Sequence, residues 1–419
     1  MNSNAALAGA LAAYRQGRAE EARRAAEEIW RASSDARAAG LLALLEMDAG
    51  RLDAALAWND RACAADPSEV RYEVQGARLC ALKDDHGAAH DRFAAIARSR
   101  PDTPAAWSGL VAAARKADRR DEARALAAAA YDADPRLAPA LEALLDLAAD
   151  EPPPESRVPA VPLADRSPIS VITCSNAEHR FAAMAASYHR ALADWPHEIV
   201  RIGDAASLAE GYTRAAAIAR GEVFVFTHDD VEILAPDFGH RLARRLDGCD
   251  ILGVAGATRA AGPAWFLAGW PHLHGMVVYP EGSGYRVTAY SRSVPVAHGI
   301  RVMDGVFLAM RREVALTIGW DAETCDGFHG YDVDFTLRAA DAGLRLAVAS
   351  DLALVHRSYG SFDDRWRATA SKLSAKHPEL NGPYSRDISF VRRTVPDAAS
   401  AMALIDNWAR PGQSPGPAA

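Results

Sequence analysis

The stretch Glu222-Val-Phe-Val-Phe-Thr-His-Asp-Asp230 joins a short hydrophobic run to two adjacent aspartates. A run of β-branched and aromatic residues that ends in polar ones is typical of a buried strand. Two carboxylates held directly after such a strand are placed like ligands of a divalent cation, which could bridge them to a diphosphate. An Asp-Asp pair also serves as a strand-end turn or a helix cap, so the pair alone leaves both interpretations open.

Two more strand patterns precede this stretch. They cover residues 169–173 and 198–202, and helical patterns separate the three strands. This alternation predicts a mostly parallel sheet with helices on its faces. Ligands of such sheets bind where strands end at their carboxyl edges, so the residues after each strand should share one neighbourhood. These residues are Ser175, Asn176, Gly203, Asp204, His228, Asp229 and Asp230.

The first 150 residues contain a repeat. Pro67, Pro101 and Pro135 lie 34 residues apart, and each unit reads as two helical patterns rich in alanine and leucine. A helix-turn-helix unit of this period resembles the tetratricopeptide repeat, over about residues 5–139. The resemblance implies an all-α solenoid with a concave surface for a protein partner or a polymeric substrate. The alternative is a solenoid that only holds the chain together.

Proline-rich segments mark the domain boundaries. Residues 151–168 contain six prolines and no apolar period, which predicts a semi-stiff, extended linker. We therefore predict a repeat domain at 1–150, the linker at 151–168, a second domain at 169–380, and a C-terminal extension with a flexible tail at 381–419.

Composition disfavours several classes of protein. The 419 residues suffice for two or three domains, and a formal charge of -8 argues against broad attraction to nucleic acid or anionic lipid. The five cysteines form no CxxC pair, so we expect neither a disulfide framework nor a thiolate metal site. The N-terminus lacks a basic signal-peptide region and no apolar run is long enough to span a membrane, which favours a cytoplasmic protein.

Residues 169–380 resemble glycosyltransferase family 2. The segments that carry the resemblance are 169–176, 207–212 and 219–231, where His228-Asp229-Asp230 stands in place of the family's Asp-x-Asp motif. The resemblance implies an α/β, nucleotide-sugar-binding fold of the GT-A type, with Mn²⁺ or Mg²⁺ bound at Asp230. It also implies a set of residues that contact the nucleotide sugar, namely Thr173, Ser175, Asn176, Asp204 and Asp229.

Two later segments resemble the acceptor side of the same family. Asp304 begins a polar turn before a hydrophobic strand, and Tyr331-Asp332 stands where the family has Glu-Asp. The resemblance implies that Asp304 contacts the acceptor and that Asp332 takes the proton of the attacking hydroxyl. The alternative for Asp332 is a helix cap. Asp334 and Arg338 lie four residues apart on a predicted helix, so we interpret them as an exposed or semi-buried ion pair.

Histidines and aromatic residues supply the remaining candidates. The resemblance implies that His356, after an apolar run, contacts the metal or the diphosphate, although a lone histidine is more often structural. His228 could simply pack beside the carboxylates, and His329 could cap the loop before Asp332. The aromatic stretch at 265–290, which includes the candidate acceptor contact Trp270, either stacks on a sugar or forms a hydrophobic cluster under a loop.

These interpretations favour a metal-dependent, inverting glycosyltransferase. It would move a sugar from a nucleotide-diphosphate donor to a protein or glycan acceptor, which the repeats could recruit. The alternative is an inactive scaffold, because Tyr331 replaces the family's glutamate. A nucleotidyltransferase is less favoured, since no glycine-rich loop with arginine and lysine follows the first strand.

Overall fold

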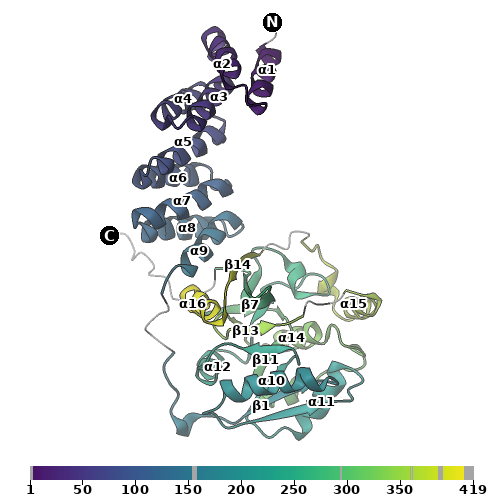
Figure 1. Ribbon diagram of the computed structural model, residues 1–419. Helices are drawn as coiled ribbons and strands as arrows, with labels where there is room; N and C mark the ends of the chain where they lie inside the picture. The colour runs from purple at the N-terminus through teal and green to yellow at the C-terminus, as the bar shows by residue number, and fades with distance from the viewer. Residues whose placement is uncertain are drawn as a thin grey trace, which may run out of the picture. The chain divides into compact units, whose positions relative to one another are not determined.

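The computed structural model describes residues 3–152, 158–292, 295–358, 360, 362–385 and 390–409. It divides the chain into two units, residues 1–147 and 148–419, whose elements Figure 1 labels. Residues 153–157 of the predicted linker and 410–419 of the predicted tail lie outside the described residues. None of the helices in the described part of the chain combines the length and the apolar character that a membrane span requires.

The N-terminal unit is all α. Its helices α4, α6 and α8 end at Ala65, Ser99 and Ala133, so equivalent helices end 34 residues apart. This spacing matches the predicted period and confirms the predicted all-α repeat solenoid. The helices of the unit are α1 (Ser3–Arg15), α2 (Ala19–Ser33), α3 (Ala36–Asp48), α4 (Leu52–Ala65), α5 (Val70–Leu82), α6 (His86–Ser99), α7 (Pro104–Ala117), α8 (Arg120–Ala133) and α9 (Ala138–Ala149).

Small residues allow these helices to approach closely. Ala22 and Ala26 of α2 are fully buried against α1 and α3. A Cβ at Gly109 of α7 would lie 2.4 Å from the ring of Phe93 on α6, closer than a real side chain can come. The alanine-rich composition therefore fits helices that pack side by side along the unit.

The C-terminal unit is built on a seven-stranded sheet with the order β2-β1-β3-β11-β5-β12-β9. The predicted parallel arrangement holds for β2, β1 and β3, but β11 runs antiparallel to both of its neighbours, so the sheet is mixed rather than mostly parallel. The reason is that the chain enters β11 at the edge where β3 ends, with Phe307 paired to Thr227. The strands are β1 (Ile169–Cys174), β2 (His197–Ile202), β3 (Val223–Thr227), β5 (Ile251–Gly253), β9 (Val296–Ile300), β11 (Phe307–Arg311) and β12 (Leu346–Ala349).

A second sheet lies beyond the end of β3. Its strands follow the order β10-β6-β7-β13-β4, and β8 pairs with β7 and β14. His356 on β13 pairs with Val231 on β4, which brings residues 125 positions apart in the sequence side by side. These strands are β4 (Val231–Ile233), β6 (Ala255–Ala257), β7 (Leu273–Glu281), β8 (Gly284–Ala289), β10 (Val302–Met303), β13 (Leu354–His356) and β14 (Val391–Val395).

Helices cover the sheets of this unit. Ser207 begins α11 by accepting a hydrogen bond of 3.1 Å from the backbone N–H of Glu210, as a capping serine does. The predicted C-terminal extension is part of the unit, because β14 pairs with β8 and α16 contacts both strands. The helices are α10 (Glu178–Ala191), α11 (Leu208–Ile218), α12 (Phe238–Leu246), α13 (Arg312–Ile318), α14 (Tyr331–Asp341), α15 (Asp364–Lys376) and α16 (Ala398–Trp408).

Candidate functional site

A cavity of about 490 Å³ opens at the carboxyl edge of β1, β2 and β3. Ser175 and Asn176 after β1, Gly203 after β2, and residues 228–230 after β3 all line it. We predicted that the residues after these three strands lie close together. The structure brings most of them together around this cavity.

Asp229 is fixed at the wall of this cavity. The hydroxyl of Ser175 donates a hydrogen bond of 2.7 Å to its Oδ2 atom, and Nε of Arg180 lies 3.6 Å from the same oxygen. Arg180 also lines the cavity, so a cationic group and a hydroxyl stand beside the aspartate there. The site can therefore offer both a carboxylate and a positive charge to a nucleoside diphosphate.

Two predicted donor contacts face elsewhere. Thr173 is fully buried inside β1, and its neighbour Cys174 lines the cavity instead. The side chain of Asp204 is 81% exposed and pairs with Arg214 at 2.9 Å, while Gly203 and Ala205 line the cavity. The sequence placed both residues near a strand end correctly, but strand alternation and a competing arginine turn their side chains away.

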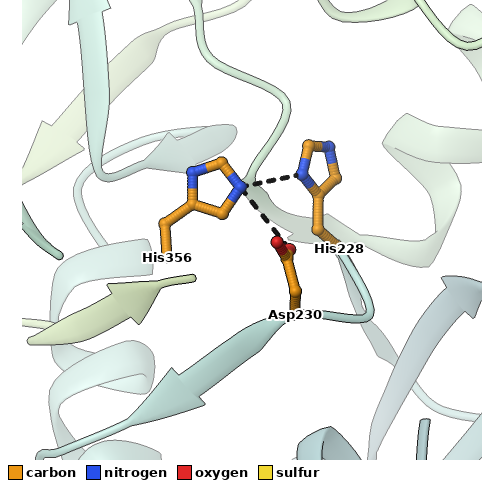
Figure 2. A group of neighbouring side chains, drawn as sticks. All are labelled: His228, Asp230 and His356. Carbon is orange, nitrogen blue, oxygen red and sulfur yellow. Dashed lines mark hydrogen bonds and ion pairs between the residues drawn. The ribbon is translucent and has the colours of Figure 1, made fainter. Parts of the chain in front are cut away.

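A group of side chains that could hold a metal ion lies on one side of the cavity. Asp230 and His356, the predicted metal ligands, meet there with Oδ1 and Nε2 separated by 3.5 Å. His228 joins them, since its Nδ1 atom lies 3.4 Å from the same Nε2 atom (Figure 2). One ligand atom from each residue lies within 4.8 Å of the others. From the sequence we considered that His228 could simply pack beside the carboxylates, whereas the structure places it within the cluster.

Electrostatics favours an anionic Asp230 in this cluster. Burial opposes its ionisation, but hydrogen bonds from His356 and Ser358 lower its pKa below the ordinary carboxyl value. The pKa of His356 is raised, because the attraction of Asp230 outweighs burial. Burial and the neighbouring His356 lower the pKa of His228. The cluster thus combines a carboxylate with imidazoles, which are ordinary metal ligands.

A second cavity, of about 400 Å³, meets the first at this cluster. His228 and His356 line both cavities, and so do His329 and Ser358. The second cavity also contains Asp304 and Asp332, while aromatic side chains form much of its wall. Its aromatic residues are Trp265, Phe266, Tyr279, Tyr290, Phe328, Tyr331, Phe362, Trp366 and Phe390.

Asp332 is held by backbone donors in this second cavity. It accepts hydrogen bonds of 2.9 Å from the N–H groups of Gly305 and Val333. Burial and the nearby Asp304 raise its pKa to about 7, against the effect of these donors. Helix α14 begins at Tyr331, with Gly330 in the capping position, so Asp332 is not the residue that caps it.

Asp304 contacts the aromatic stretch at Trp265, a residue of that stretch that we did not predict as an acceptor contact. Nε1 of Trp265 donates a hydrogen bond of 2.8 Å to Oδ2 of Asp304, and both residues line the second cavity. Nε1 of Trp270 instead donates to the carbonyl of Tyr290 at 2.7 Å. Trp265 therefore lines the second cavity, whereas Trp270, the predicted acceptor contact, is not among its lining residues. Trp265 begins a single-turn 3-10 helix, Trp265–Ala268, and Trp270 lies in the loop after it, so no apolar period separates the two in the sequence.

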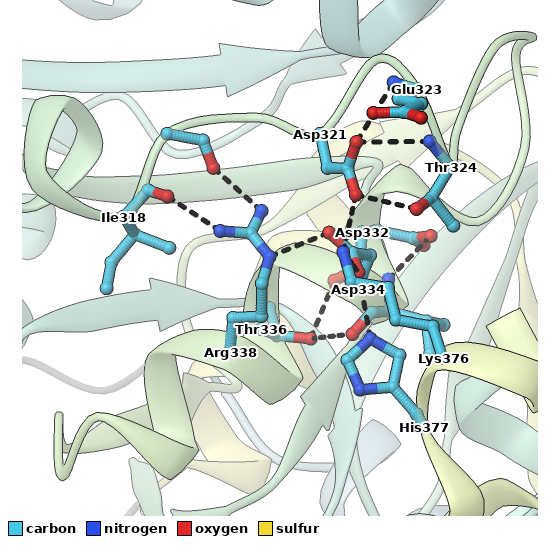
Figure 3. A network of polar contacts seen from close by, with 12 residues as sticks. Ile318, Asp321, Glu323, Thr324, Asp332, Asp334, Thr336, Arg338, Lys376 and His377 are labelled. Carbon is cyan, nitrogen blue, oxygen red and sulfur yellow. Dashed lines mark hydrogen bonds and ion pairs between the residues drawn. The ribbon is translucent and has the colours of Figure 1, made fainter.

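A buried network supports the helix that carries Asp332 (Figure 3). Asp334 pairs with Arg338 at 2.8 Å, as predicted, but Asp334 is only 1% exposed and not exposed or semi-buried, because Lys376 at 2.6 Å and His377 at 2.8 Å also contact it. Burial opposes ionisation of Asp334, but the hydrogen bonds from Lys376 and His377 and the charge of Arg338 lower its pKa. Arg338 further donates to the carbonyl of Ile318 at 2.6 Å. The network joins α14 to α15 and to the loop after α13.

His329 does not cap the loop before Asp332 in the way that we considered. Its Nε2 atom lies 3.8 Å from Oδ1 of Asp363, at the start of α15. His329 and Phe328 line both cavities. The loop before α14 is therefore a shared wall of the two cavities.

Comparisons with known proteins give a family match for the C-terminal unit. Residues 170–377 match the model of a family described as "Glycosyltransferase like family". No curated protein matches the chain.

Several solved structures are similar to part of the chain. They include PilF of Pseudomonas aeruginosa, with 15% identity and a TM-score of 0.28, for which the match covers 35% of this chain and 67% of that chain. MamA of Desulfovibrio magneticus has 16% identity and a TM-score of 0.29, with 35% and 82% covered. A tetratricopeptide repeat protein of Parabacteroides merdae has 17% identity and a TM-score of 0.28, with 35% and 57% covered.

Proposed function

We propose that this chain, a glycosyltransferase by its family domain, moves a sugar from a nucleotide-diphosphate donor to an acceptor hydroxyl with the help of a divalent metal. The single observation that supports this most is that two cavities meet at His228 and His356, beside Asp230, which lines the first cavity. The first cavity is the proposed donor site and the second is the proposed acceptor site. The sugar would lie where they join.

The residues of the cluster fit a divalent cation. Asp230 offers a carboxylate oxygen and His356 an imidazole nitrogen, 3.5 Å apart, and the lowered pKa of Asp230 keeps its carboxylate ionised. A cation bound there would neutralise charge on the donor diphosphate and on the departing nucleotide. Ser175, Asn176 and Asp229 line the same cavity and would hold the rest of the nucleotide.

Asp332 is the proposed base. Its carboxylate lies in the second cavity, and a pKa of about 7 is close to the value that suits a base working near neutral pH. It would accept the proton of the acceptor hydroxyl as that oxygen attacks the anomeric carbon. Attack from the acceptor side, opposite to the leaving diphosphate, inverts the configuration at that carbon.

The wall of the second cavity supports a sugar-containing acceptor. Trp265 and Tyr290 pack edge to face with ring centroids 5.0 Å apart, and Phe362 and Trp366 form a similar pair at 5.2 Å. Such amphipathic, rigid rings provide a contact surface for the apolar faces of a ligand, while Asp304 offers a polar group. We further propose that the N-terminal repeats recruit a protein that carries or presents this acceptor.

The experiment is donor hydrolysis and donor binding with a panel of nucleotide sugars, in the presence of Mn²⁺ or Mg²⁺. We expect one donor to bind and to be hydrolysed slowly only when metal is present. In Asp230→Ala this metal-dependent binding should be lost, because one of few oxygen ligands is removed. If no nucleotide sugar binds the wild type with either metal, the proposal is wrong and the inactive scaffold becomes the better interpretation.

A further inference from the structure

We infer that His228 is the third ligand of the metal site, that it binds the metal through Nδ1, and that Tyr331 fixes the tautomer which makes this possible. This inference rests on the proposed metal dependence. It assigns a ligand and a positioning residue beyond the pair formed by Asp230 and His356.

The distances fit three ligands around one cation. Nδ1 of His228 lies 3.4 Å from Nε2 of His356, which lies 3.5 Å from Oδ1 of Asp230 (Figure 2). Metal bonds of roughly 2.1 Å place neighbouring ligand atoms about 3.0 to 3.4 Å apart in octahedral or tetrahedral geometry. The three side chains are therefore close to the arrangement that a bound cation requires.

The hydrogen bonds of Tyr331 determine where His228 carries its proton. The hydroxyl of Tyr331 donates to the carbonyl oxygen of Gly305 at 3.2 Å. A hydroxyl has a single hydrogen, so with that hydrogen on Gly305 the same oxygen accepts from Nε2 of His228, at 2.8 Å, and this is the tautomer that we assign. Nε2 of His228 then carries the proton and Nδ1 carries the lone pair, which faces Asp230 and His356. A metal-binding histidine commonly has its other ring nitrogen fixed by a hydrogen bond in this way.

Packing keeps the hydroxyl of Tyr331 in place. The side chain is only 4% exposed, and its ring contacts those of Tyr212 and Trp320 with centroids 5.6 and 5.9 Å apart. A Cβ at Gly305 would lie 2.2 Å from the hydroxyl oxygen, so the backbone there closes over it. The residue that replaces the family's glutamate is therefore a rigid acceptor for one particular imidazole hydrogen.

The ligand set predicts a preference among metals. Two imidazoles and one carboxylate suit Mn²⁺ and other transition metals better than Mg²⁺, which prefers oxygen ligands and retains water. With His228 as a ligand, the site should bind Mn²⁺ more tightly than Mg²⁺. Without His228 this preference should become smaller.

The test measures binding of MnCl₂ alone and of MgCl₂ alone to the full-length, metal-free protein by calorimetry, without donor or turnover. Tyr331→Phe removes only the hydroxyl, and we expect its Kd for Mn²⁺ to rise about 10- to 100-fold. Tyr188→Phe is the matched control, because its buried hydroxyl donates to Oγ1 of Thr227 at 3.2 Å and does not face the cluster. Its Kd for Mn²⁺ should equal that of the wild type.

His228→Ala and pulsed EPR of bound Mn²⁺ provide the second readout. We expect nitrogen couplings from two imidazoles in the wild type and from one in His228→Ala. If His228→Ala and Tyr331→Phe both bind Mn²⁺ like the wild type while Asp230→Ala does not, the inference is overturned and the proposed metal dependence stands. If the wild type itself binds neither metal, the metal dependence in the proposed function fails as well.

Discussion

The backbone N–H of Gly305 donates a hydrogen bond of 2.9 Å to Oδ2 of Asp332, which ties the first turn of α14 to the turn that begins β11. The same turn carries Asp304, whose Oδ1 accepts from the N–H of Val306 at 2.8 Å. Two carboxylates are therefore held close together by backbone donors. Their mutual repulsion and burial raise the pKa of Asp332.

Asp332→Asn should abolish transfer while the protein stays folded. The amide keeps the size of the side chain and one acceptor oxygen, but it cannot take the proton of the acceptor hydroxyl. We expect a fall of about 10²- to 10⁴-fold in kcat, with donor affinity and Tm near the wild-type values. Steady-state kinetics, donor calorimetry and thermal unfolding measure the three quantities. Turnover near that of the wild type would make Asp304 the next candidate for the base.

The raised pKa of Asp332 predicts a pH dependence. The carboxyl must be ionised to act as a base, so kcat/KM for the acceptor should rise with pH and level off above an apparent pKa of about 7. The residual activity of Asp332→Asn should lack this rise. A pH-rate profile that is flat from pH 5.5 to 8.5 in the wild type would contradict the assignment.

The raised pKa of Asp332 also makes stability depend on pH, in the opposite direction to activity. A carboxyl whose pKa is higher in the folded than in the unfolded chain stabilises the fold most below the unfolded pKa of about 4. This contribution is lost as the pH rises through about 7. We therefore compare the unfolding free energy of Asp332→Asn with that of the wild type at each pH. The value for the variant minus the value for the wild type should increase as the pH rises from about 4 to about 7.

Asp334, two residues further along α14, should affect stability rather than chemistry. Its removal leaves Arg338, Lys376 and His377 without their common buried partner. We expect Asp334→Ala to lower the free energy of unfolding by about 3–5 kcal/mol, measured by urea denaturation. Asp341→Ala on the same helix is the control, since its pair with Arg301 at 2.7 Å is half-exposed. That loss should be at most about 1 kcal/mol, and equal losses in the two variants would contradict this role for the network.

The sequence predicted what depends on local pattern. The period of the repeats and the strands before Ser175 and Asp229 follow from apolar spacing, and the structure contains both. Side-chain direction at the strand ends was harder to predict, because Asp204 pairs with Arg214, ten residues away. The position of His228 in the cluster depends on Tyr331 and His356, which only the folded chain brings close. Pairings over such sequence distances have no local signal.

Trp265 should matter for the acceptor, whereas Trp270 should not. Trp265→Phe keeps an aromatic ring but removes the hydrogen bond of 2.8 Å to Asp304. A hydrogen bond to a charged group contributes roughly 1.5–3 kcal/mol, so we expect KM for the acceptor to rise about tenfold or more. Trp270→Phe removes a hydrogen bond to the backbone carbonyl of Tyr290, and Trp270 itself is not among the residues that line the second cavity. Equal effects of the two variants on acceptor KM would show that Trp265 has no direct part in the acceptor site.

The C-terminal unit should fold without the repeats if the cut precedes Ala148. Nδ2 of Asn407 donates to the carbonyl oxygens of Ala148 and Glu151 at 3.1 and 3.0 Å, and the N–H of Val161 donates to Nδ1 of His240 at 3.0 Å. The described part of the predicted linker thus contributes contacts to this unit, and a cut within it would leave buried polar groups unsatisfied.

We therefore expect residues 148–419 to unfold in one cooperative transition and to retain metal-dependent donor hydrolysis. Residues 169–419 should have a lower Tm, because the contacts of Asn407 and His240 are removed. If the repeats recruit the acceptor, the 148–419 fragment should hydrolyse donor at the rate of the full chain but lose most transfer to a macromolecular acceptor. Transfer by this fragment at the full-chain rate, with the same acceptor KM, would contradict a recruiting role for the repeats.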